Sequence, residues 1–201
     1  MKNLSAIFMA CMISSCITTS SAQDVKLGAA GNLGTTNWSR EYNDASTRVV
    51  FGLGVAGEYA ITEKLNVGAE LLYSSIGPKI DDPEDDFFGR VSIPNIQIPL
   101  FASYEVIDHL RIHAGLQPAF ILSVNAVLTN DPYNGEKYDL SENYGSFNMD
   151  FILGASYDIT DNLAGLLRIN QGLVDVETER ETRDFKTTGI HLGVRYWLVK
   201  K

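Results

Sequence analysis

Apolar side chains alternate with small or polar ones over most of this 201-residue chain, and this period of two constrains its fold most strongly. Between residues 49 and 61, for example, single glycines separate Phe51, Leu53 and Val55. An extended strand places successive side chains on opposite faces. The alternation therefore predicts β-strands with one face in an apolar medium and the other in a tight, polar one.

The same pattern recurs in eight segments, joined alternately by short links and long polar connections. The segments are residues 25–35, 49–61, 65–76, 93–107, 110–122, 146–159, 163–173 and 187–198. The short links are 62–64, 108–109 and 160–162; the long connections are 36–46, 77–92, 124–145 and 175–186. Antiparallel barrels of the outer membrane sort their connections by end in this way. We therefore predict an all-β fold, an eight-stranded antiparallel up-and-down transmembrane β-barrel with short periplasmic turns and long extracellular loops.

Tyrosines recur at the short-link end of the even-numbered segments. The sequence around Tyr59 is echoed around Tyr104 and Tyr157, and Tyr196-Trp197 closes the chain in the corresponding place. Amphipathic rings at one level are typical of the belt at a membrane interface. We predict such a belt, as opposed to ordinary cross-strand packing in a soluble sheet.

The opposite strand face carries charge of both signs. The positions expected to point inward include Glu58, Glu70, Glu105, Asp150, Asp158, Lys26, Arg111, Arg168 and Arg195. The interior of an eight-stranded barrel is only wide enough for side chains, and unpaired buried charge is costly. The sequence therefore predicts an ion network that fills the lumen, with no conducting pore.

The N-terminal segment has the pattern of a secretory signal peptide. Lys2 precedes an apolar stretch that is too short to span a bilayer, and small residues end at Ala22. We expect residues 1–22 to be a signal peptide and residues 23–201 to be the barrel. An alternative is a lipobox in which Cys16 is lipidated. Both cysteines, Cys11 and Cys16, lie in this segment, so the mature chain has no disulfide.

The composition excludes several classes of protein. A hydrophobic content of 45% favours a folded chain, and the absence of long apolar runs after the leader excludes a polytopic helical membrane protein. The net charge of -9 argues against nucleic acid as a partner. Much of this acidity lies in the long connections. Five carboxylates cluster in one of them: Asp81, Asp82, Glu84, Asp85 and Asp86. They lack the spacing of a calcium loop, so a solvated charged loop is favoured over a Ca²⁺ or Mg²⁺ site.

Catalytic or cofactor chemistry has little support in the sequence. His109 lies in an expected turn, and His113 and His191 are expected to point inward. Neither inward histidine has a serine at the neighbouring position on the same face, as a barrel esterase or deacylase requires. There is no glycine-rich phosphate loop and no metal-binding triad. We therefore predict neither enzymatic activity nor a cofactor.

Three short motifs resemble those of the PorT-like outer membrane β-barrel proteins of the Bacteroidetes type. They are Ile96-Gln97-Ile98-Pro99-Leu100-Phe101 followed by Tyr104, Leu167-Arg168-Ile169-Asn170-Gln171-Gly172-Leu173, and Gly193-Val194-Arg195-Tyr196-Trp197. The resemblance implies an eight-stranded barrel in the outer membrane. The named PorT member is associated with type IX secretion, but many relatives have no assigned role. The chain departs from the pattern because it ends in Val199-Lys200-Lys201 and not on an aromatic residue. Pro99 and Pro118 fall inside strands, where we expect β-bulges.

The sequence as a whole predicts a non-enzymatic, monomeric barrel of the outer membrane of a Gram-negative cell. Its expected partners are outer membrane lipids, the barrel assembly machinery, and a surface ligand or protein that contacts the acidic loops. One alternative is a soluble, secreted, lipocalin-like barrel that binds a small apolar ligand. A second is an accessory component of protein secretion, and a third is a barrel enzyme that acts on lipid.

Overall fold

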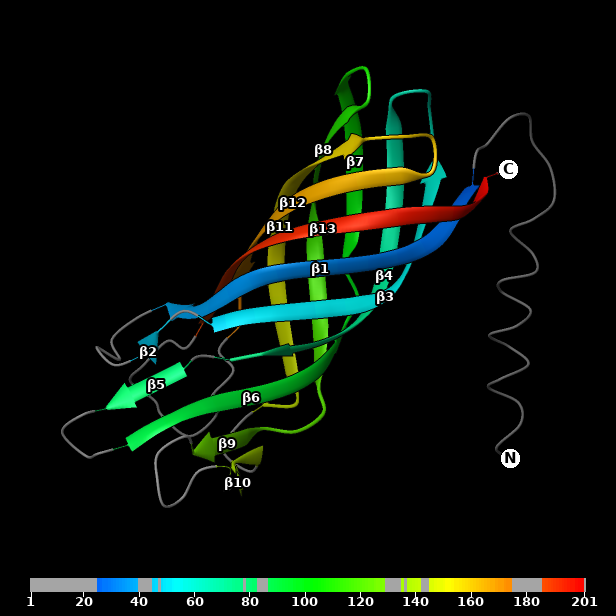
Figure 1. Cartoon of the computed structure of the whole chain (residues 1–201). Coiled ribbons are helices and arrows are strands. Elements are labelled where there is room, and N and C mark those ends of the chain that lie inside the picture. The colour runs from blue at the N-terminus through cyan, green and yellow to red at the C-terminus, as the bar shows by residue number, and fades with distance from the viewer. Residues whose placement is uncertain are drawn as a thin grey trace, which may run out of the picture.

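The computed structural model describes residues 25–39, 45–46, 48–77, 79–82, 87–128, 135, 137–141, 145–174 and 186–200. The predicted signal peptide and Cys16 lie outside these ranges. The described chain forms a closed antiparallel barrel, and it contains no helix long and apolar enough to cross a membrane. Figure 1 shows β13 beside β1, so that the C-terminal strand closes the wall against the N-terminal one.

Eight wall strands make up the barrel, in the number and order that the sequence predicts. They are β1 (Val25–Ser39), β3 (Arg48–Ala60), β4 (Leu65–Ile76), β6 (Phe87–Gln97) continued by β7 (Leu100–Ile107), β8 (Leu110–Ile121), β11 (Phe147–Asp158), β12 (Leu163–Gly172) and β13 (Lys186–Lys200). Each pairs antiparallel with its neighbours along the chain, and β1 pairs with both β3 and β13. The predicted fold class is confirmed.

The fourth wall strand, β6 continued by β7, is interrupted at Ile98 and Pro99, but the expected bulges are absent there. The ladder pairs on either side of the break are Gln97 with Ala119 and Leu100 with Leu116. Two residues on each strand lie between these pairs, so no residue is inserted. The carbonyl of Pro99 still accepts from the Glu70 N–H at 2.9 Å, and that of Pro118 accepts from the Ile98 N–H at 2.8 Å. The prolines therefore remain acceptors, and the ladder loses only their missing donors.

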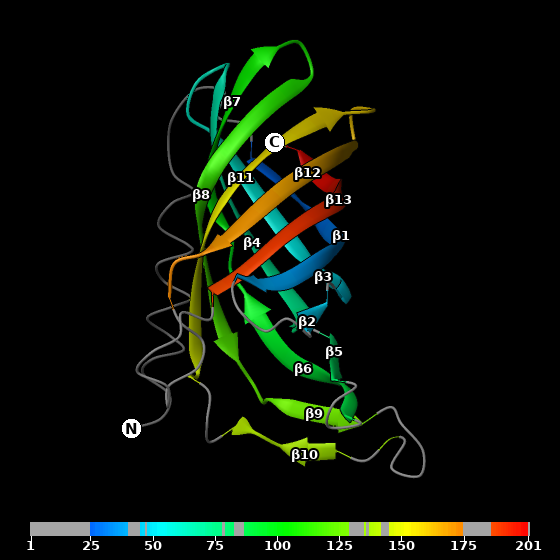
Figure 2. The same ribbon diagram turned by 90° about the vertical axis from the view of Figure 1, so that its left-hand side faces the viewer.

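The long-connection end contains more β-structure than the sequence predicts. β6 begins at Phe87, six residues before the expected start at residue 93, and the stretch that we expected to be loop pairs with other strands. The additional strands are β2 (Ala45–Ser46), β5 (Lys79–Asp82), β9 (Asn125–Leu128) and β10 (Lys137–Asp139). They form a small second sheet around β6, away from the β7–β8 turn in Figure 2. This sheet extends one side of the barrel at its long-loop end.

The opposite end consists of tight links, as predicted, and is called the short-turn end below. Thr62 and Thr160 begin two links of the same form. In each link the threonine Oγ1 accepts two backbone N–H groups, from Lys64 and Leu65 or from Asn162 and Leu163. Such side-chain hydrogen bonds stabilise turns. The sequence recurrence at these positions is therefore a recurrence of turn structure.

The alternation in the sequence separates the two faces of the wall. The outer face exposes large apolar side chains along the whole length of the wall strands. The charged and polar side chains of the inner face are mostly buried. Among the described residues, two small apolar clusters are buried. One comprises Ala30, Ala56, Leu72 and Trp197, and the other Ile76, Val91, Ile93 and Val124. A barrel with this distribution is apolar outside and polar inside.

Candidate functional site

Two arginines and two glutamates form an ion cluster in the middle of the lumen. Arg168 donates from Nη1 and Nη2 to the two carboxylate oxygens of Glu70, at 2.9 and 2.8 Å. Arg195 donates from Nε to Glu70 at 2.8 Å and from Nη1 to Glu58 at 2.9 Å. The exposed fraction of each of these four residues is 6% or less. Their charges balance, so burial leaves no net charge uncompensated.

An aromatic ring supports this central cluster. The guanidinium carbon of Arg195 lies 4.6 Å from the ring centroid of Phe101, and that of Arg168 lies 5.9 Å from it. Both distances allow cation–π attraction. Gly68 makes space for the ring, because a Cβ atom there would lie 2.5 Å from Cζ of Phe101. The buried His113 ring is tilted against Phe101 at a centroid distance of 5.5 Å. The centre of the lumen is therefore filled.

A second ion cluster lies near the short-turn end. Arg111 donates from Nη2 to Glu105 and from Nη1 to Asp158, both at 2.6 Å. These side chains are more exposed than the central ones, with exposed fractions of 14% for Arg111, 23% for Glu105 and 19% for Asp158. Solvent screens such pairs more strongly than buried ones.

Asp150 belongs to neither ion cluster. Four neutral donors surround its carboxylate: Gln117 at 3.2 Å, Asn148 at 3.0 Å, Asn170 at 3.5 Å and Thr187 at 3.0 Å. Our prediction of one ion network that includes Asp150 is therefore wrong in this respect. The barrel places Asp150 towards the long-loop end, where its neighbours among the described residues carry amides and hydroxyls. Neutral hydrogen-bond donors satisfy this carboxylate in place of a cation.

The structure places four residues of the predicted belt on the outer face and the fifth inside the barrel. Tyr59, Tyr104, Tyr157 and Tyr196 all lie on the outer face near the short-turn end. Trp197, which we also assigned to the belt, points into the barrel with an exposed fraction of 3%. Neighbours on a strand face opposite sides, so Tyr196 and Trp197 cannot both face outward. Trp197 packs in the first apolar cluster, and the Lys26 ammonium lies 5.9 Å from its ring centroid.

The structure places the three histidines and two residues of the acidic run. His113 and His191 are buried inside the barrel, and His109 lies in the β7–β8 turn with a positive φ of 69°. Across the described ranges, no three His, Cys, Asp or Glu side chains are grouped for metal binding. Of the acidic run, Asp81 and Asp82 lie in β5, while Glu84, Asp85 and Asp86 fall outside the described residues. Their predicted solvation stays a prediction.

One pocket was missed by the sequence analysis. It encloses about 420 Å³ where the outer face of the barrel wall meets the small second sheet. Its lining residues come from β3, β4, β6, β9 and β10 and include three cations: Arg48, Arg90 and Lys137. These cations are far apart in the sequence and lie in segments that we expected to be loops or strand ends. The pairing of β6 with β9, and of β9 with β10, brings Lys137 to Arg90, and Arg48 of β3 reaches β6 through its hydrogen bond to the Val91 carbonyl.

A closed eight-stranded barrel with an apolar outer face and a charged, filled interior defines a transmembrane β-barrel. The chain belongs to the outer membrane protein beta-barrel domain family, whose sequence model matches residues 21–177. The protein is therefore an outer membrane barrel. No curated protein sequence matches the chain.

The chain is similar to solved structures of a Yersinia pestis protein and a Neisserial protein. One is Ail, the attachment invasion locus protein of Yersinia pestis, in complex with the heparin analogue sucrose octasulfate. It has a TM-score of 0.50 and 10% sequence identity, and the match covers 88% of this chain and 99% of Ail. Neisserial surface protein A has a TM-score of 0.49 and 16% identity, with coverage of 89% and 99%. At these identities the likeness to Ail shows the barrel fold alone.

Proposed function

We propose that this protein is a non-enzymatic, non-conducting barrel that presents acidic loops at the cell surface, where they contact a ligand or partner. The filled lumen carries the proposal. Glu70 is held by Arg168 and Arg195 across the centre of the barrel, and the fully buried Ile152 and Gln117 occupy the space towards the long-loop end. A lumen packed in this way favours a role for the outside of the barrel and its loops over transport through it.

The difference between the two ends of the barrel supports the orientation that we propose. In this orientation the four outward tyrosines mark the periplasmic interface, and the long, acidic connections lie outside the cell. Phe147 and Tyr157 lie ten residues apart on the outer face of β11. At about 3.4 Å per residue and a tilt of about 40°, this separation corresponds to a band about 25 Å tall. Such a band matches the apolar height of an outer membrane barrel.

The alternatives differ in how well the outer and inner faces support them. A lipocalin-like barrel requires an apolar interior, whereas this interior carries ion clusters and the apolar face points outward. A lipid-acting enzyme requires a nucleophile beside His113 or His191 that its substrate can reach. Neither histidine has a serine on its own strand face, and Ser103, which pairs across the ladder with His113, is buried with it inside the barrel. The Ile98-Pro99-Leu100 motif favours a PorT-like member of the family. An accessory role in secretion rests on that resemblance alone.

Conductance measurements test the proposal. The purified mature barrel is inserted into planar lipid bilayers, and the ion current is recorded at moderate voltage. We expect no steady current from the wild-type protein. As a comparison, the double variant Phe101→Gly with Arg195→Gly removes side chains from the centre of the lumen. Any current should arise in this variant before it arises in the wild-type protein. A steady, single-channel current through the wild-type barrel would contradict the proposal.

A further inference from the structure

The wall of the barrel has a notch at the long-loop end, beside the pocket described above. The β3–β4 ladder ends at the pair Gly52 and Ser74, although β3 continues for four residues beyond it to Arg48. Side chains span the gap in place of ladder hydrogen bonds. Arg48 Nη1 donates to the Val91 carbonyl on β6 at 2.7 Å, and Ser74 Oγ donates to the Phe51 carbonyl at 3.1 Å. The notch is therefore a built feature of the wall.

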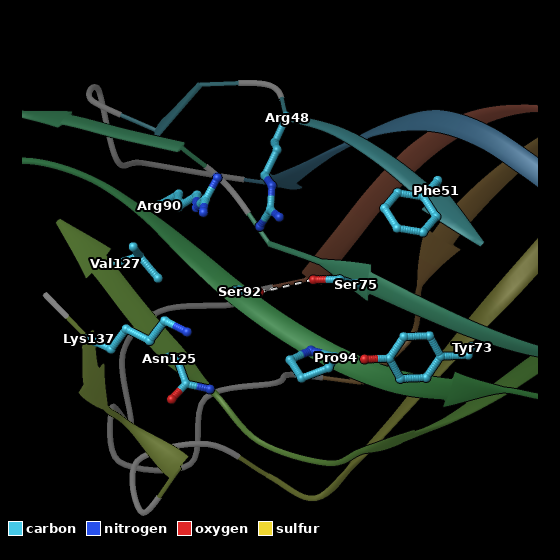
Figure 3. Close-up of a pocket in the computed structure, with 10 residues that line it drawn as sticks. All are labelled: Arg48, Phe51, Tyr73, Ser75, Arg90, Ser92, Pro94, Asn125, Val127 and Lys137. Carbon is cyan, nitrogen blue, oxygen red and sulfur yellow. Dashed lines mark hydrogen bonds between the residues drawn. The ribbon is translucent and has the colours of Figure 1, made fainter. Parts of the chain in front are cut away.

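The pocket at this notch has an aromatic side and a cationic side. Figure 3 shows Phe51 and Tyr73 together on one side and Arg48, Arg90 and Lys137 on the other. The exposed fractions of Phe51 and Tyr73 are 57% and 54%, and both rings lie on the apolar outer face. Between the two sides, the hydroxyl groups of Ser75 and Ser92 are hydrogen-bonded to each other at 3.1 Å. Ser75, Ser92 and Asn125 add neutral polar groups to the lining.

The cationic side lacks a matching carboxylate among the described lining residues. Arg48, Arg90 and Lys137 all line this one pocket, and each carries a positive charge. Like charges that face one pocket destabilise each other, and an anion between them removes that cost. Such a cluster of cations is notable in a chain with a net charge of -9. The pocket is thus complementary to an anionic group.

We propose that this pocket binds the phosphate-bearing headgroup of a membrane lipid, with the acyl chains running down past Phe51 and Tyr73. The aromatic side favours a lipid over a soluble anion, because it continues the outer apolar face: Tyr73 pairs across the ladder with the exposed Leu53. Aromatic side chains at the edge of the apolar band and cations just above it match the two parts of an anionic lipid. The orientation proposed above places this lipid in the outer leaflet, but the binding itself does not depend on orientation.

Lipid retention tests the proposal. The full barrel is folded in phosphatidylcholine nanodiscs that contain a small fraction of phosphatidic acid, and the bound phosphatidic acid is titrated and counted by native mass spectrometry. Arg90→Gln combined with Lys137→Gln should weaken phosphatidic acid binding about tenfold, since two charge-assisted contacts are lost at an exposed site. Arg48 is left intact because its hydrogen bond to Val91 supports the wall.

Matched controls separate specific binding from general attraction. Lys64→Gln with Lys200→Gln removes the same charge from exposed positions at the short-turn end, and phosphatidic acid binding should be unchanged. Heat-dependent migration in gels checks that every variant is folded. Equal losses in the two double variants would overturn the proposal in favour of non-specific charge attraction.

A second arm identifies the source of the phosphate. Inorganic phosphate alone is titrated against the barrel in pure phosphatidylcholine nanodiscs. We expect it to bind far more weakly than phosphatidic acid. Tyr73→Ser should weaken the binding of the lipid and leave that of inorganic phosphate unchanged. If inorganic phosphate binds as tightly as the lipid, or if Tyr73→Ser has no effect on the lipid, the site is one for a free anion and the lipid assignment is wrong.

Discussion

Replacing Glu70 by glutamine tests the energetic role of the central ion cluster. Glu70 is the shared acceptor of Arg168 and Arg195, and it is almost fully buried. Glutamine has nearly the same shape, but it is neutral and offers only one acceptor oxygen. In the variant, Glu58 is the only remaining carboxylate for two buried guanidinium groups in this cluster. The substitution therefore leaves one positive charge without compensation.

The expected cost follows from the burial of the arginines. Breaking a buried ion pair by removing one partner costs about 3–5 kcal/mol, because the remaining charge stays desolvated. A matched substitution, Glu105→Gln, acts on the partly exposed cluster at the short-turn end, where Arg111 keeps its contact with Asp158. We expect that change to cost about 1 kcal/mol or less. The two substitutions share their chemistry and differ in burial.

Equilibrium unfolding in urea, with the protein folded into lipid vesicles and followed by tryptophan fluorescence, measures both free energies. Glu70→Gln should lower the free energy of unfolding by several times the loss for Glu105→Gln. Adding Arg168→Met to Glu70→Gln restores the charge balance and should recover part of the stability. Equal unfolding midpoints for the two single variants would refute the reasoning that the central cluster is desolvated and acts as a unit.

Three further predictions concern the two faces and the two ends of the barrel. Phe151→Arg places a cation in the middle of the apolar band and should destabilise the barrel in lipid by about 2–4 kcal/mol. Tyr157→Arg, near the interface, should cost only about 0–1 kcal/mol. Equal losses of stability in the two variants would mean that this face does not contact lipid. Trypsin added to intact cells should cleave near the exposed Lys137 and spare Lys64 in the short turn, and the reverse pattern would invert the proposed orientation. Trp197→Ala should cost about 3–5 kcal/mol by leaving a cavity inside the barrel, and a neutral effect would show that the ring is not packed there.

The sequence alone was sufficient for the wall of the barrel. Alternation of apolar residues with glycine in segments such as 49–61 depends only on the two-residue period of an extended backbone, which is a local property. The same period, applied strictly, also separates Tyr196 from Trp197. Short turns such as Thr62–Lys64 are equally local, because their hydrogen bonds join residues two or three positions apart.

The tertiary structure decided which inward residues meet. Glu70 and Arg168 are 98 residues apart in the sequence, and Glu58 and Arg195 are 137 residues apart. Their pairing depends on the strand register and on closure of the barrel, which no local pattern encodes. For the same reason, the sequence predicted that Asp150 lies inside the barrel but could not identify its neutral partners. The cationic pocket is the clearest case. Pairing of β6 with β9 and of β9 with β10 brings Lys137 to Arg90, and Arg48 reaches β6 from the part of β3 that lies beyond the end of the β3–β4 ladder.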